Sequence, residues 1–185
     1  MAVMSTTRTH PGPTSPAAAP APPAHSPAAG RIWALTRVSL GLGYLWTFLD
    51  LTFGLGMGTP AERAWLTGNS PIRWSLINLD GPVAELVHPT SGQPAVDLAL
   101  MVFLFATGVA LLLGVALWPA AALNAVVMGL TAAVRWPEPS DTFIDAHLIF
   151  LLLGVGLAAA RAGDVWGLGP VWRRSPLVRR LPWLR

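Results

Sequence analysis

The sequence predicts an all-α integral membrane protein, a four-helix bundle whose first extracytoplasmic loop carries short surface helices. Its composition is 53% hydrophobic and only 11% charged, with a mean hydropathy of +0.53. Four stretches of about 20 residues are almost free of charge, and a helix of that length rises roughly 30 Å, the hydrocarbon thickness of a bilayer. Since the backbone of a spanning segment must satisfy its own hydrogen bonds in lipid, a helix is the expected conformation of each stretch.

Residues 1–30 precede the bundle and contain seven Pro among Ala, Ser and Thr. This composition is typical of a disordered tail, which we expect on the cytoplasmic side. The bundle is expected over residues 31–166, followed by a second cytoplasmic tail over 167–185 that is rich in Arg and Trp. One membrane domain is therefore predicted between two terminal tails.

The first span is expected over residues 33–53. Between Val38 and Phe53 it holds a single ionisable residue, Asp50. Arg37 lies near the start of this span, where its long side chain is expected to snorkel to the lipid headgroups. The glycines of the GLGMG segment at residues 54–58 are expected to end the helix.

Residues 59–93 are predicted to form a cap on the membrane surface. Thr59 to Glu62 fit a capping box with Pro60 at the first helical position, which predicts one short helix. Ser70-Pro71 begins a second short segment with several apolar residues, and residues 82–88 form a third. All three are too short and too polar to cross a bilayer, so we expect them to lie at its surface.

Three more spans are expected over residues 95–118, 119–136 and 143–162. The second and third spans are separated only by a tight turn at Trp118-Pro119. In the third span, small residues recur at every fourth position: Ala121, Ala125, Gly129 and Ala133. This spacing lets helix backbones approach closely in lipid and predicts a tight bundle.

The distribution of Arg predicts the orientation of the bundle. All 12 basic residues are Arg. With both termini on one side, nine Arg lie on that side and three on the other. The excess places both termini in the cytoplasm, with the chain in the inner membrane. A cluster in the C-terminal tail is expected to attract anionic lipid, at about 1 kcal/mol per residue near the surface. It consists of Arg173, Arg174, Arg179 and Arg180.

Composition also excludes several classes of function. The sequence pI of about 11.0 suits a nucleic-acid binder. However, the Arg residues flank hydrophobic segments and form no soluble basic face, so no nucleic-acid partner is expected. Because the chain has no Cys, it has no thiol catalysis, disulfide relay or Fe–S ligation of its own.

Four ionisable residues are predicted to gather at the outer ends of the spans: Asp50, Asp97, Asp145 and His147. Ionisable groups within spans usually face a bundle interior or a wet cavity, so these residues form the candidate functional site. A His beside carboxylates at this depth is suited to hydrogen-bond a quinone headgroup and relay its proton. No metal is expected, because Asp145 and His147 are two positions apart, cannot share a helix face and belong to no metal-binding motif.

Each of these four residues also has a structural alternative. Asp97 and Asp145 stand where an acid favours the N-terminus of a helix. His147 is alternatively a buried, hydrogen-bonded side chain with no chemical role. For Asp50 the alternative is an ion pair with one Arg of the outer loops: Arg63, Arg73 or Arg135.

Five short motifs follow one another in the chain: Arg37-x3-Gly41, FLDLTFGLG at residues 48–56, GNSP at 68–71, DAH at 145–147 and WGLG at 166–169. Together they resemble the DoxX family, and most closely its actinobacterial members, over residues 32–185. The resemblance implies a small four-helix bacterial membrane protein. Some members are small subunits of a thiosulfate:quinone oxidoreductase, and others are linked to membrane redox-defence complexes. Where many relatives have Asp-Lys this chain has Asp50-Leu51, which counts against an inherited thiosulfate site.

The leading hypothesis is an accessory membrane subunit of a redox complex. It would contact quinone or a partner subunit through Asp50, Asp97, Asp145 and His147, and quinone is the one cofactor expected. The first alternative is a small subunit of a thiosulfate:quinone-type oxidoreductase, which needs a bound cofactor or partner to carry electrons. The second is a small-solute carrier, for which four short helices offer enough room only in a homo-oligomer.

Overall fold

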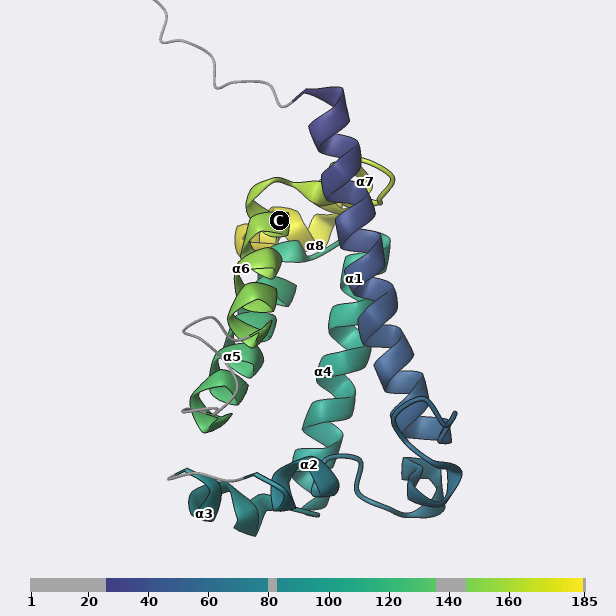
Figure 1. Cartoon of the computed structure of the whole chain (residues 1–185). Coiled ribbons are helices and arrows are strands. Elements are labelled where there is room, and N and C mark those ends of the chain that lie inside the picture. The colour runs from purple at the N-terminus through teal and green to yellow at the C-terminus, as the bar shows by residue number, and fades with distance from the viewer. Residues whose placement is uncertain (1–25, 80–82, 136–145, 185) are drawn as a thin grey trace, which may run out of the picture.

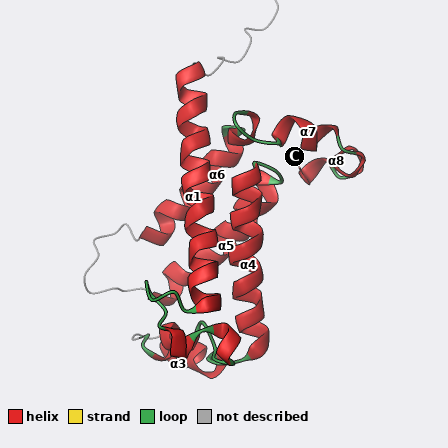
Figure 2. Ribbon diagram, turned by 90° about the vertical axis from the view of Figure 1, so that its right-hand side faces the viewer, coloured by secondary structure: helices red, strands yellow, loops and turns green. Residues whose placement is uncertain are grey.

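The computed structural model describes residues 26–79, 83–135 and 146–184, and every regular element in these ranges is a helix (Figure 1, Figure 2). The four longest are α1 Pro27–Phe53, α4 Pro94–Leu113, α5 Leu117–Arg135 and α6 Ala146–Ala159. The shorter helices are η1 Ala61–Arg63, η2 Trp65–Thr67, α2 Arg73–Ile77, α3 Ala84–Val87, η3 His88–Thr90, η4 Ala162–Asp164, α7 Gly169–Arg174, α8 Pro176–Arg180 and η5 Pro182–Leu184.

Three of the helices are long and apolar enough to cross a membrane, namely α1, α4 and α5. The prediction of an all-helical chain with spanning helices is confirmed to this extent. α6 is apolar too but comprises only 14 residues. The fourth predicted span, residues 143–162, begins outside the described residues, so a fourth crossing stays a prediction.

The four long helices pack as two pairs. α1 packs along α4, and α5 packs along α6, while contact between the pairs is less extensive and runs mainly between α4 and α5. In Figure 1 the pairs meet at the end that carries α7 and α8 and separate toward the end that carries α2 and α3. The predicted four-helix bundle is therefore not confirmed.

Two helix ends differ from the predicted spans, and in both cases a residue at the helix terminus explains the difference. α1 begins at Pro27 and not at residue 33, because the Ser26 hydroxyl accepts a hydrogen bond from the N–H of Ala29 and proline suits the first turn. The second predicted span, residues 95–118, was too long. α4 ends at Leu113 because Gly114 has a left-handed backbone (φ 71°). The tight turn follows at once, and α5 begins at Leu117.

The segment between α1 and α4 forms the predicted cap of short helices, at the opposite end of the molecule from the first turn of α1 and the C-terminal helices (Figure 1). The capping box predicted at Thr59 is wrong, because η1 has Pro60 as its N-cap residue and no side-chain capping bond. The N–H of Thr59 instead donates to the carboxylate of Asp50. This bond ties the start of the cap to the last turn of α1.

A polar contact joins the two helix pairs inside the core. The hydroxyl of Tyr44 in α1 donates to the side-chain oxygen of Asn124 in α5. The amide nitrogen of Asn124 donates to the carbonyl of Phe150 in α6 at 2.9 Å. Tyr44 also meets Phe103 of α4 edge to face. Because buried polar groups in lipid must find partners within the protein, this contact favours one arrangement of the helices.

Arg37 does not snorkel to headgroups, and that prediction is wrong. The residue is fully buried, at 0% exposure. Its guanidinium donates to the carbonyls of Leu111, of Leu112 at 2.8 Å, of Ala162 at 3.2 Å and of Trp166 at 3.0 Å. The carbonyls of Leu111 and Leu112 lie in the last turn of α4, where backbone carbonyls lack the usual intrahelical donors. Those of Ala162 and Trp166 lie in the segment that follows α6. Arg37 therefore joins three parts of the chain.

Glycines allow the backbone to close around Arg37. A Cβ at Gly163 would lie 2.2 Å from the carbonyl oxygen of Gly114, and one at Gly114 would lie 3.0 Å from the Arg37 guanidinium. Gly167, within the WGLG motif, is equally crowded, because a Cβ at this position would lie 2.5 Å from the carbonyl oxygen of Gly163. Side chains at these positions would separate the segments that Arg37 joins.

Candidate functional site

Asp50 lies in the last turn of α1 and shapes the loop that follows. Its carboxylate accepts hydrogen bonds from the backbone N–H groups of Met57 at 3.2 Å, Gly58 at 3.0 Å and Thr59 at 2.8 Å. The chain can turn back toward Asp50 because Gly54 ends α1 with a left-handed backbone. Within the described residues Asp50 forms no ion pair. It therefore meets backbone donors in place of the arginine suggested as its structural alternative.

A cavity of about 420 Å³ lies beside Asp50, between the end of α1 and the cap. The guanidinium of Arg63 stacks over the indole of Trp74, with its carbon 3.9 Å from the ring centroid. Trp46, on the next-to-last turn of α1, is 49% exposed and forms another wall. The remaining lining residues are Thr47, Leu51, Met57, Gly58, Thr59, Pro60, Ser70, Pro71 and Ser75.

Asp97 lies in the first turn of α4 and is buried, at 5% exposure. Its carboxylate accepts a hydrogen bond from the Ser70 hydroxyl at 2.6 Å. The Ser70 oxygen in turn accepts from the N–H of Arg73 at 3.2 Å, at the start of α2. Asp97 thus ties the cap to the N-terminus of α4. It reaches the cavity only through Ser70.

The structure does not assemble the predicted four-residue cluster. It places Asp50 in the cavity wall and Asp97 behind that wall. His147 lies in the first turn of α6, half-buried, and is not among the lining residues of this cavity. Asp145 lies outside the described residues. In the part of the chain that the structure describes, no three side chains of His, Asp or Glu are grouped to hold a metal ion.

Sequence analysis missed Arg63, Trp74 and Ser70 as site residues. Arg63 and Trp74 lie 11 positions apart in a loop without regular periodicity, so no spacing rule pairs them. Ser70 belongs to the GNSP motif, which was a usable signal, since a Ser before Pro often holds the start of a helix. Only the fold of the cap shows that Ser70 also meets Asp97.

Three of the five short motifs of the sequence contain residues that lie at structural joints of this fold. Arg37 joins three segments, and a Cβ at Gly41 would lie 2.9 Å from the backbone of Leu112 in α4. Asp50 and Ser70 hold the cap. These three motifs therefore include residues that hold the fold together.

No protein-family model, curated protein or solved structure matches this chain. The resemblance to DoxX accordingly stays a prediction. What the structure shows by itself is a helical chain with three helices able to cross a membrane and a cavity under its cap.

Proposed function

We propose that this chain is a DoxX-like, four-pass inner-membrane protein that serves as a non-catalytic, quinone-contacting subunit of a membrane redox complex. Both termini are placed in the cytoplasm, and the cap lies at the outer surface. The quinone site is the cavity beside Asp50, in place of the four-residue cluster expected from the sequence.

The observation that carries this proposal is the Arg63–Trp74 stack in the cavity wall. A quinone headgroup is a planar ring with two carbonyl acceptors. Trp74 and Trp46 supply flat apolar surface, while the Arg63 guanidinium and the Ser75 hydroxyl supply donors. A volume of about 420 Å³ falls in the range of small-molecule sites. The exposure of Trp46 near the end of a spanning helix gives a bilayer quinone a route to the cavity.

The accessory role follows from how the acidic groups are used. Asp50 accepts hydrogen bonds from three backbone N–H groups and from the Thr59 side chain, and Asp97 accepts from Ser70. Carboxylates held in this way shape the cap and are poorly placed to take a proton from a quinol. With no Cys in the chain, electrons must pass through a partner.

The cavity offers less support for a sulfur-anion site. Its cation, Arg63, shares the lining with the carboxylate of Asp50, so the two charges offset each other. If the chain is instead a thiosulfate:quinone-type subunit, quinone should be reduced when thiosulfate is added to the purified chain together with its cofactor or partner. A carrier predicts solute flux in liposomes without quinone. We expect neither from the chain alone.

Quinone binding tests the proposal directly. Titration of the detergent-purified protein with a short-chain quinone should quench tryptophan fluorescence in a saturable way. Trp74→Leu should weaken this binding by about tenfold, because it removes the stacking surface and frees Arg63. Trp166→Leu is the matched control, since Trp166 is exposed near the opposite end of the molecule. Equal quenching constants for wild type and Trp74→Leu would exclude this cavity as the quinone site.

The absence of native Cys makes the topology testable by single-cysteine labelling. Leu66→Cys in the cap should react with an impermeant thiol reagent in intact cells. Arg174→Cys and Ala28→Cys should react only after the membrane is opened. All three positions are exposed. Labelling of positions 28 and 174 from opposite sides would rule out an even number of crossings.

A further inference from the structure

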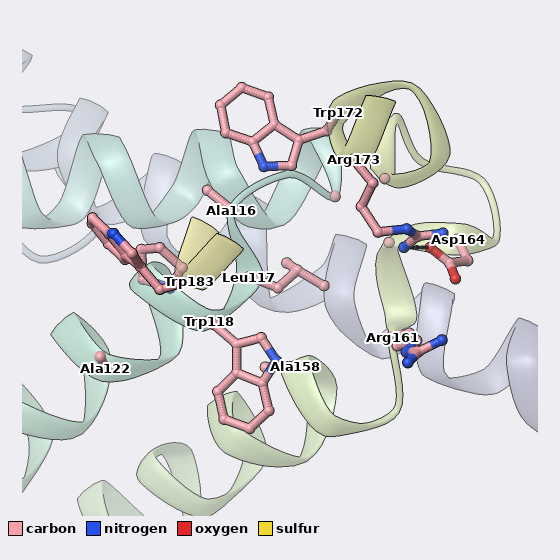
Figure 3. Close-up of a pocket in the computed structure, with 14 residues that line it drawn as sticks. Ala116, Leu117, Trp118, Ala122, Ala158, Arg161, Asp164, Trp172, Arg173 and Trp183 are labelled. Atoms are coloured by element: carbon pink, nitrogen blue, oxygen red, sulfur yellow. Dashed lines mark hydrogen bonds and ion pairs between the residues drawn. The ribbon is translucent and has the colours of Figure 1, made fainter. Parts of the chain in front are cut away.

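A second and larger cavity lies at the other end of the molecule, away from the cap and the proposed quinone site. Its volume is about 910 Å³, and α5, the end of α6 and the C-terminal helices form its walls. Figure 3 shows the indoles of Trp118, Trp172 and Trp183 on one side. Arg161 and the ion pair between Arg173 and Asp164 lie on the other. The aromatic and the charged residues thus lie on opposite sides of the cavity.

The cavity lies at one end of α5, where we expect a headgroup layer of the bilayer. Trp118 lies in the first turn of the spanning helix α5 and is 48% exposed, and Trp183 is 64% exposed. Tryptophan is enriched at this depth because one part of the ring is apolar and the N–H is polar. Leu168, Val171 and Leu177 add exposed apolar side chains around the same end.

Charge favours an anionic occupant. Residues 160–184 contain five Arg and one Asp. Arg173 is engaged by Asp164, but within the described residues the guanidinium of Arg161 has no hydrogen-bond or ion-pair partner. Arg161 is also one of three non-glycine residues in these ranges with positive φ, at 50°. A glycine would adopt this conformation with less strain, so backbone geometry gives no reason for an arginine at this position.

We propose that this cavity binds the headgroup of an anionic phospholipid, with the phosphate on Arg161 and the glycerol and upper acyl carbons against Trp118 and Trp183. Arg presents a planar fork of donors that fits a phosphodiester. The proposal goes beyond general attraction of the arginine tail to a charged surface, because it places one lipid in one built cavity. It does not depend on quinone binding at the cap.

Thermal unfolding of delipidated protein in detergent tests the proposal. Added phosphatidylglycerol should raise the melting temperature in a saturable way, whereas phosphatidylcholine should not. In the Arg161→Gly variant the apparent affinity for phosphatidylglycerol should fall by about tenfold, since one charge-assisted contact is lost. The lipid-free melting temperature of this variant should equal or exceed that of wild type, because glycine accepts the left-handed backbone.

The control is Arg174→Gln, which removes the same charge from an exposed position that does not line the cavity. This variant should keep the response to phosphatidylglycerol. Trp118→Leu keeps an apolar side chain but removes the indole, and it should weaken the response to phosphatidylglycerol. An equal loss in Arg174→Gln would show diffuse electrostatic attraction and overturn the proposal. A shift of the same size with phosphatidylcholine, or with glycerol 3-phosphate alone, would also overturn it.

Discussion

Replacing Arg37 with Met should destabilise the protein more than any exposed substitution in the same helix. Methionine fills most of the volume of the arginine stem but removes the guanidinium. The carbonyls of Leu111, Leu112, Ala162 and Trp166 then lose their shared donor. The junction of α1, α4 and the segment after α6 would be held by packing alone.

The size of the effect follows from opposing terms. A hydrogen bond from a charged donor contributes about 1.5–3 kcal/mol, and Arg37 makes four such bonds. Burying the guanidinium offsets several kcal/mol of this gain. Groups released in the membrane also find other partners, which reduces the loss further. We expect a net loss of about 2–4 kcal/mol in the free energy of unfolding.

Unfolding by SDS in mixed micelles, followed by circular dichroism, measures this loss. Arg31→Met is the matched control, because Arg31 lies in the same helix and is exposed. It should change stability by no more than about 0.5 kcal/mol. If Arg37→Met lost no more than Arg31→Met, the buried arginine would not hold the junction, and the reasoning would fail.

Three further predictions concern the helix contacts and the cap. Gly163→Ala should cost about 3 kcal/mol or prevent folding, because its Cβ would lie 2.2 Å from a carbonyl oxygen. Gly43→Ala, with nothing within 4 Å of the new Cβ, should stabilise α1 by about 0.5–1 kcal/mol; equal melting temperatures for the two variants would contradict this. Tyr44→Phe and Asn124→Leu should show a coupling of about 0.6–1.7 kcal/mol in a double-mutant cycle, and additive losses would argue against the bond between them. Asp97→Ala should cost about 1–2 kcal/mol and speed proteolysis within the cap; cleavage at the wild-type rate would show that the cap is held elsewhere.

The helical class and most helix positions could be predicted because they depend on local properties. Long apolar stretches predicted α1, α4 and α5, and Gly54 ended α1 as expected. The end of α4 was missed because one glycine, Gly114, outweighs the apolar run that continues past it. Hydrophobicity predicts that a segment enters lipid, but backbone geometry decides where its helix ends.

The candidate site could be predicted only in part. The sequence marked Asp50 and Asp97 as candidates because acids are rare beside long apolar segments, and the structure places Asp50 in the wall of the cavity under the cap. Its grouping of these acids with a histidine rested on membrane depth alone. Depth does not specify which helix face or which partner a side chain meets, and Asp50 meets the backbone of its own loop.

By itself, the sequence determined that this chain is helical and rich in segments suited to lipid, because these properties follow from composition and from the spacing of residues along the chain. Only the tertiary structure decided the roles of its charges. Arg37, expected at the headgroups, is buried among carbonyls that come from residues 111–166. Arg63 lies on Trp74. A buried charge is stable only where several segments converge to satisfy it, and that convergence is a property of the packed chain.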